Sequence, residues 1–372
     1  MSHPRGPLAK LYDPSHPVTE SLLKRGYAIV RVCSEEEANR LADGIWNDLE
    51  SMQTGICRHS PSSWTSDKLP QHTHGLLQNQ NMGLRKGVCA ARLSTKPVFE
   101  SIFAGRECIS SFDAITFSTP AMQQREFARE QKFQTDNSEP QLLSSWLHTD
   151  QAKTKPDCGI YVQGAFALTD WGKAEKKTQI VVPRLEETMQ DFRDRFVKKF
   201  PALSVAKGKF DPEREEWIKH SMQEREWLLA NGRIVSPILN KGEMLLWDSG
   251  LPHGSLPGPC STTRNLRMGI FVSARPVQLI TYNDVIVRRH MLEKGHTSGH
   301  RVTSLGKRTY RQCKFSETGQ VYGSKRLPEY DKSGVLSGFK DAFERGDETS
   351  VEYGTAVFCG AYGLEHKLLK DF

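Results

Sequence analysis

Two histidines and one aspartate are the residues of this 372-residue chain whose types and spacing could do chemistry. His148 and Asp150 form an HxD pair, and an apolar run at 244–247 leads through a turn to His253. Because side chains alternate along a strand, His148 and Asp150 would lie on one face of a strand end. Two histidines and a carboxylate on one face, with the opposite positions open, are typical of non-heme Fe(II) oxygenase sites.

An arginine beyond His253 could anchor a co-substrate that chelates the iron. The planar guanidinium fork matches a carboxylate at the far end of such a molecule. Arg264 and Arg267 both follow, and strand alternation makes them face opposite ways, so one should point inward. We favour Arg267, because Gly269 on the same face would leave room beside a co-substrate. Arg264 stays open as the alternative.

Each of these residues also has a purely structural interpretation. His148 could be a hydrogen-bonded histidine, Asp150 a turn cap and His253 a loop histidine. The three residues in this order, followed by an arginine, favour the metal site. A second pair, His72 and His74, lies in a loop-rich region without a third partner, and we interpret it as polar surface.

Short apolar runs broken by turn residues predict the strands that carry these side chains. A strand is expected at 26–32, followed by a helix that begins after Ser34. Further elements are a helix at 97–103 and strands at 110–117, 159–168, 178–182, 234–238, 244–247 and 266–272. Strands of this kind suggest a sandwich or barrel, mixed with helices at the start and in the insertion.

Two segments fall outside this strand pattern. Residues 184–233 are heavily charged with apolar residues at helical spacing, which predicts a helical insertion. We interpret it as a solvated helical face, with a lid over the site as the alternative. After Asp284 the chain turns basic and irregular.

Composition limits the classes of protein that need considering. The chain is 37% hydrophobic and 26% charged, which is ordinary for a globular protein and excludes general disorder. No apolar run approaches the roughly 20 residues that span a bilayer, and residues 1–12 have no apolar core. Eight dispersed cysteines without a CxxC pair indicate reduced thiols. We therefore expect an intracellular, cytoplasmic protein without a membrane segment.

The chain resembles the phytanoyl-CoA dioxygenase superfamily of Fe(II)/2-oxoglutarate oxygenases, and within it a fungal- and viral-type subgroup without one assigned activity. The resemblance spans about residues 25 to 310 and rests on motifs in the family's order. These motifs are 110–114, 148–151, 161–164, 246–249 before His253, Arg267 with Pro276, and 296–300. The chain departs from the family's pattern at 174–178 and 183–186, near where the substrate usually lies.

The resemblance implies a mainly β fold with flanking helices, a double-stranded β-helix (jelly roll, cupin-like) with a helical insertion. The whole chain, 1–372, would be one oxygenase domain. Residues 1–109 would form an N-terminal region of strand, helices and loops, and 110–183 with 234–282 the jelly-roll core. Residues 184–233 would be the insertion and 283–372 a C-terminal basic extension.

The resemblance also implies roles for particular residues. His148, Asp150 and His253 would bind Fe(II), and 2-oxoglutarate would chelate the iron while Arg267 or Arg264 pairs with its far carboxylate. O₂ would be the second co-substrate, and succinate and CO₂ would be products. Because halogenating relatives lack the carboxylate, Asp150 favours hydroxylation or another oxidation over halogenation.

Five further residues could have either a functional or a purely structural role. Gln163 could donate to 2-oxoglutarate or be a hydrogen-bonded core residue, and Tyr161 would share its face. Trp247 is expected in the core, with a substrate contact as the alternative. Arg288 and His300 could hold an anionic substrate, although a solvated basic face explains them equally simply.

Three competing functions remain at this stage. One is an iron enzyme that does not use 2-oxoglutarate, and another is a non-catalytic metal-binding jelly-roll protein. The third is a nucleic-acid-binding protein, for which the net charge of +7 is the only support. We expect a small-molecule substrate and no nucleic acid.

Overall fold

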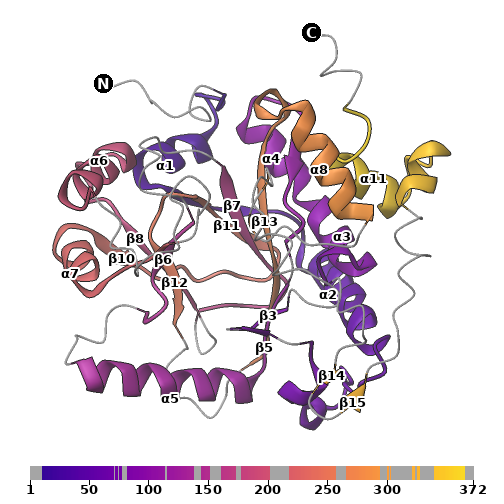
Figure 1. Cartoon of the computed structure of the whole chain (residues 1–372), viewed down its shortest axis with the longest axis horizontal. Coiled ribbons are helices and arrows are strands. Elements are labelled where there is room, and N and C mark those ends of the chain that lie inside the picture. Colours follow the sequence, from indigo (N-terminus) through magenta and orange to yellow (C-terminus); the bar gives the residue numbers. More distant parts are fainter. Residues whose placement is uncertain are drawn as a thin grey trace.

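The computed structural model consists of two antiparallel sheets flanked by helices (Figure 1). In it we find no helix, among the residues described, with the length and apolarity needed to cross a membrane. The structure describes residues 11–70, 72–73, 75–77, 82–113, 115–137, 144–150, 161–172, 177–201, 218–256, 265–293, 300, 302, 321–322, 325–326 and 339–364.

The larger sheet has the strand order β1-β11-β7-β13-β5-β3-β2, and β4 also pairs with β13. Its long strand β13 is central and pairs with both β7 and β5. Its strands are β1 (Tyr27–Arg31), β2 (His72–Thr73), β3 (Leu76–Leu77), β4 (Cys108–Ser110), β5 (Ile115–Ser118), β7 (Val162–Ala167), β11 (Glu243–Asp248) and β13 (Arg267–Pro276).

The smaller sheet has the strand order β10-β8-β12-β6-β9. Its strands are β6 (His148–Thr149), β8 (Lys177–Val182), β9 (Ile218–Lys219), β10 (Arg233–Val235) and β12 (His253–Leu256). Every pairing in both sheets is antiparallel. A separate two-stranded pair joins β14 (Val321–Tyr322) and β15 (Lys325–Arg326).

Nine α-helices have both ends within the described residues, and residues 339–344 are also helical. The nine helices are α1 (Pro17–Arg25), α2 (Glu35–Glu50), α3 (Lys86–Ser94), α4 (Lys96–Ile102), α5 (Pro120–Asn137), α6 (Met189–Lys199), α7 (Met222–Asn231), α8 (Tyr282–Glu293) and α11 (Val351–Phe358). Short 3-10 turns lie at Pro61–Ser63, Ser66–Lys68, Met82–Leu84 and Val277–Leu279. As expected, Ser34 caps α2, because its side chain accepts the backbone N–H of Glu37.

Three apolar cores arrange the sheets and helices in layers. One face of the larger sheet packs on α2, α3 and α4, and its other face meets the smaller sheet in a second core that includes Trp247 and Ile180. The far face of the smaller sheet packs through Val181 on α6 and α7. Figure 1 shows the same order, with α6 and α7 on one side and α2, α3 and α8 on the other. Side chains on the inner faces therefore lie between two sheets.

The prediction of a mainly β protein was wrong, because helices make the architecture a mixed one. The sequence patterns missed α1, α3, α5, α8 and α11, and the region after Asp284 that we expected to be irregular is helical as far as Glu293. α5 has few apolar residues, so its helical periodicity is weak. The strand expected at 110–117 is two strands, β4 and β5, which pair with different parts of β13.

Candidate metal centre

Two neighbouring strands of the smaller sheet bring the two histidines together. His148 begins β6 and His253 begins β12, and the two residues are direct partners in the antiparallel ladder. His253 also pairs with Ile180 of β8. Since cross-strand partners point to the same face, and Ile180 belongs to the core between the sheets, both imidazoles point inward.

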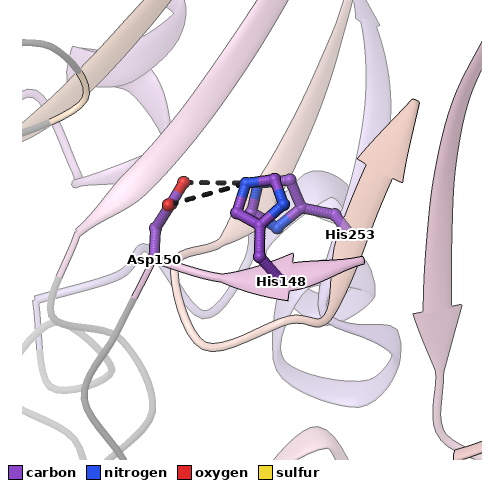
Figure 2. A group of neighbouring side chains, drawn as sticks. All are labelled: His148, Asp150 and His253. Carbon is purple, nitrogen blue, oxygen red and sulfur yellow. Dashed lines mark ion pairs between the residues drawn. The ribbon is translucent and has the colours of Figure 1, made fainter. Parts of the chain in front are cut away.

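Asp150 completes a group of three possible ligands. One ligand atom from each of His148, Asp150 and His253 lies within 4.8 Å of the other two. The Nε2 atom of His253 is 3.3 Å from Asp150 Oδ2, and that of His148 is 3.7 Å from Asp150 Oδ1. Figure 2 shows the two imidazole rings side by side and facing the carboxylate, with ring centroids 4.3 Å apart.

Backbone hydrogen bonds fix which imidazole nitrogens stay available. The Nδ1 atom of His148 is 2.7 Å from the carbonyl oxygen of Trp146, and that of His253 is 2.8 Å from the carbonyl oxygen of Leu251. Because a carbonyl only accepts, each Nδ1 carries the proton and each Nε2 presents a lone pair. This arrangement is the one that histidine ligands of metals adopt.

One carboxylate oxygen of Asp150 is hydrogen-bonded, and the other has no hydrogen-bond partner among the described residues. Oδ2 accepts a hydrogen bond of 2.7 Å from Gln163 Nε2. Oδ1 is buried and has no hydrogen-bond partner among the described residues. A buried carboxylate oxygen left without a donor is costly unless a cation binds it. Asp150 Oδ1 and the two Nε2 atoms therefore form an N,N,O donor set that fits a divalent metal such as iron.

Charges around the site agree with this donor set. Burial lowers the pKa of His148 to about 3, and the neighbouring His253 contributes in the same direction, so His148 is neutral near pH 7. Burial alone would raise the pKa of Asp150, but His300, His148 and His253 lower it well below its usual range. A neutral His148 beside an ionised Asp150 carboxylate is what metal binding by these two residues requires.

Arg267 is a buried cation on the inner face of the larger sheet. It is 2% exposed and forms no ion pair with a described residue. Its guanidinium lies 4.0 Å from the ring centroid of Trp171 and donates a 3.2 Å hydrogen bond to Thr178 Oγ1, while its Nε has no hydrogen-bond partner among the described residues. Burial lowers its pKa to about 10, partly offset by Glu126, so it stays charged near pH 7.

Gly269 has a different role from the one that the sequence suggested. A Cβ atom there would overlap the ring of Trp171 and the carbonyl of Phe166. The glycine thus makes room for Trp171, which stacks under Arg267, and not for a co-substrate. The other arginine candidate, Arg264, lies outside the described residues.

The strand register relates Arg267 to the metal ligands. Its partner Thr178 lies two residues before Ile180 on β8, and Ile180 pairs with His253. Thr178 and Ile180 share the inner face, about 7 Å apart along the strand. The guanidinium therefore reaches from the larger sheet to the face that carries the two histidines.

Three of the other candidates also lie at this centre. Gln163 donates to the Asp150 carboxylate, and the Tyr161 hydroxyl donates a 2.8 Å hydrogen bond to the Asp150 carbonyl. Trp247 is buried in the core between the sheets, 5.3 Å from His253 between ring centroids, and its Nε1 donor has no partner among the described residues. The side chain of Gln163 orients the candidate metal ligand Asp150.

His300 reaches the centre, but Arg288 does not line it. The Nδ1 atom of His300 is 3.7 Å from Asp150 Oδ1. Arg288 is fully buried over Phe112 and donates to the carbonyl oxygens of Cys359, Val302 and Ser110. With its donors on three carbonyls, Arg288 holds backbone segments together, so the expectation that it contacts substrate does not fit this placement.

The side chain of His72 and the whole of His74 lie outside the described residues, so the HxH pair is not described. Sequence reasoning missed Thr178 and Trp171, which contact Arg267. A threonine and a tryptophan in strand-rich sequence carry no signal of their own. Strand alternation through Ile180 and Val182 could have placed Thr178 on the inner face.

Comparisons with known proteins find structural neighbours only. No protein-family model matches the chain, and no curated protein sequence does. GlcNAc Inducible Gene 2 (GIG2, DUF1479) from Candida albicans is 11% identical, with 94% of this chain and 87% of that chain covered and a TM-score of 0.42.

Two further structural neighbours are known with a bound ligand or an activity. EctD from S. alaskensis, with 2-oxoglutarate and 5-hydroxyectoine, is 13% identical over 70% of this chain and 75% of that chain, with a TM-score of 0.38. SnoK, a non-heme alpha-ketoglutarate-dependent carbocyclase from nogalamycin biosynthesis, is 13% identical over 73% and 87%, with a TM-score of 0.34. At these scores, we assign neither a family nor an activity from the matches.

Proposed function

We propose that this protein is an Fe(II)- and 2-oxoglutarate-dependent dioxygenase that hydroxylates a small-molecule substrate and decarboxylates 2-oxoglutarate to succinate. The observation that carries the proposal is the N,N,O donor set of His148, Asp150 and His253. Both Nε2 lone pairs are fixed by backbone carbonyls, and Asp150 Oδ1 lacks any described donor. Three protein ligands leave metal positions open for co-substrates, as this chemistry requires.

Arg267 supports 2-oxoglutarate as the co-substrate. A buried arginine without a carboxylate partner among the described residues is poorly compensated, and a dianionic ligand would supply that partner. Its fork is suited to a carboxylate, and Thr178 adds a hydroxyl beside it. We propose that these two residues hold the far carboxylate of 2-oxoglutarate.

The residues of the chain bind, orient and shield in this reaction. When bound, the iron supplies the redox chemistry that couples O₂ and 2-oxoglutarate to oxidation of the substrate. Gln163 fixes the rotation of the Asp150 carboxylate, and the two carbonyl bonds fix the imidazole planes. Apolar residues of the core between the sheets, among them Trp247 and Phe271, keep bulk water from the site.

The fold and the division of the chain are part of the same proposal. Two facing antiparallel sheets with the ligands on the inner face of one sheet support a jelly roll of the double-stranded β-helix type. We propose one domain with its core at 110–183 and 234–282. In the described part of the insertion, α6 and α7 pack on the face of the smaller sheet opposite the histidines, which favours a covering role over a lid.

Turnover of 2-oxoglutarate tests the proposal directly. The full-length protein, supplied with Fe(II), ascorbate, O₂ and 2-oxoglutarate labelled at C1, should release labelled CO₂ and form succinate. His253→Ala should abolish the release, because it removes one of three ligands. Arg267→Lys should raise the KM for 2-oxoglutarate at least about tenfold, since lysine keeps the charge but loses the fork.

The outcomes separate the competing functions. Release that persists unchanged in His253→Ala would overturn the assigned ligands. Iron binding without any release of CO₂ would favour a metal-binding protein without this activity, or an iron enzyme that does not use 2-oxoglutarate. If the protein is an iron enzyme that does not use 2-oxoglutarate, Arg267→Lys would leave the activity on its true substrate unchanged.

A further inference from the structure

Two buried polar atoms beside Asp150 have no hydrogen-bond partner in the part of the chain that the structure describes. Gln163 Oε1 and His300 Nε2 are both shielded from solvent and form no hydrogen bond with any described residue. Gln163 as a whole is 3% exposed. Native proteins seldom leave such atoms unpaired, and a pair of them at a binding centre indicates a ligand.

The Asp150 carboxylate determines the chemical character of Gln163 Oε1. Gln163 donates from Nε2 to Asp150 Oδ2 at 2.7 Å. If the amide were reversed, its oxygen would face the carboxylate. Both groups are acceptors, so no hydrogen bond could form between them. The amide orientation is therefore set by chemistry, and the oxygen that faces away from Asp150 can only accept.

The Asp150 carboxylate also faces one ring nitrogen of His300. His300 Nδ1 lies 3.7 Å from Asp150 Oδ1, and the ring stacks on Tyr161 with centroids 6.1 Å apart and planes 27° from parallel. The other ring nitrogen, Nε2, is the atom that the described residues leave unpaired. Tyr161 is itself fixed by its hydrogen bond to the Asp150 carbonyl.

Val302, two residues beyond His300 in the sequence, is bound to the folded core. Arg288, fully buried on α8, donates to its carbonyl oxygen. The same guanidinium donates to the carbonyl oxygens of Ser110 of β4 and of Cys359 after α11.

We propose that the primary substrate carries hydroxyl or amine groups that donate a hydrogen bond to Gln163 Oε1 and pair with His300 Nε2. The inference rests on the function proposed above and names the substrate class of that site. The 2-oxoglutarate dianion has acceptors only, so it cannot donate to Gln163 Oε1. A substrate with O–H or N–H donors can, and pairing both atoms would position it next to the open face of the metal.

The test uses the full-length protein with Fe(II) and 2-oxoglutarate and a panel of matched compounds. The panel pairs polyols, amino alcohols and amines with their fully methylated counterparts, which keep the carbon skeleton but lack donors. Stimulation of 2-oxoglutarate decarboxylation and of O₂ consumption measures productive binding. We expect members of the donor-bearing set to stimulate, and their methylated counterparts to bind at least about tenfold more weakly.

Three variants locate the effect. His300→Phe keeps a ring against Tyr161 but has no ring nitrogen, and it should raise the KM for the stimulating compound at least tenfold, more than it changes the KM for 2-oxoglutarate. His300→Gln again offers a polar group and should recover part of the loss. His290→Phe, on the exposed side of α8, is the matched control and should behave as wild type.

Each result decides for or against the inference. Equal stimulation by methylated and donor-bearing compounds would overturn it, as would no stimulation by any donor-bearing compound. A folded His300→Phe protein with unchanged KM values would also overturn it. If the wild-type protein binds iron but consumes no 2-oxoglutarate under any condition, the proposed function itself fails. Consumption without stimulation leaves that function standing and rejects only the substrate class.

Discussion

At the scale of single residues, the candidate centre depends on hydrogen bonds that determine which atoms stay free. The carbonyl oxygens of Trp146 and Leu251 accept hydrogen bonds from Nδ1 of the two histidines. Gln163 donates a hydrogen bond to one carboxylate oxygen of Asp150. Each of these bonds reduces the number of orientations that the ligand can adopt before a metal arrives. Lower reorganisation of the ligands means tighter metal binding.

Removing the Gln163 donor should weaken iron binding. Gln163→Leu keeps the volume but leaves Asp150 Oδ2 without its hydrogen bond, so the carboxylate can rotate. We expect the affinity for Fe(II) to fall about 10- to 100-fold, measured anaerobically by competition with a chelator. Gln124→Leu, at an exposed position of α5, is the control. An affinity equal to that of wild type would show that Gln163 does not orient the ligand.

At the scale of elements, β6 is too short to position His148 by its own ladder. It has two residues, and the two serines before it are held by other elements. Gln179 of β8 accepts from Ser144 N, Arg225 of α7 donates to Ser144 O, and Glu130 of α5 accepts from Ser145 N. The insertion and α5 therefore support the metal strand from outside the sheet.

What the sequence could predict also depends on the element. HxD and the later histidine were recognisable because strand alternation is a local rule, and it applies at β6 and β12. The support of Ser145 by Glu130 was not recognisable, since a glutamate on a polar helix has no signal for burial. Arg288 was misread for the same reason: basic residues near it suggested a solvated face, while the long-range fold buries it completely.

The crossing of α2 and α3 depends on two glycines in close approach. A Cβ atom on Gly87 would overlap the backbone of Gly44 and lie 2.6 Å from the backbone nitrogen of Ile45, whereas one on Gly44 would meet its nearest atom at 3.2 Å. We expect Gly87→Ala to lower the free energy of unfolding by about 1 to 3 kcal/mol. Gly44→Ala should be nearly neutral, because helix propensity offsets the tighter contact.

Chemical denaturation of the two variants measures this contrast. The m-value should stay constant, so that midpoints report stability. Equal midpoints for Gly87→Ala and Gly44→Ala would contradict the close helix crossing.

At the scale of the whole molecule, the layered arrangement buries ionisable groups that then respond to pH. Asp48 on α2 accepts hydrogen bonds from the backbone nitrogens of Gly87 and Val88 at the start of α3. Burial nevertheless raises its pKa to about 6. Sequence patterns predict individual helices and strands. The layers that these elements form depend on contacts between distant segments, which local patterns do not encode.

The raised pKa of Asp48 should make stability fall as pH rises. Between about pH 4 and pH 6 the native state holds a proton that the unfolded state has released, so unfolding becomes easier with increasing pH and levels off above pH 6. The effect is on the order of 3 kcal/mol. Asp48→Asn should remove this component, which appears as a pH-dependent difference in Tm between wild type and variant. A difference that stays constant from pH 4 to 7 would contradict it.

The most direct test of the central claim is an anaerobic titration of the apo protein with Fe(II) and then 2-oxoglutarate, followed by visible absorption. Chelation of the iron by the co-substrate should produce a charge-transfer band. The band should be absent in His148→Ala, and in Arg267→Lys it should require at least about tenfold more 2-oxoglutarate. A wild-type protein that binds one Fe(II) and yet gives no band with 2-oxoglutarate would contradict the account.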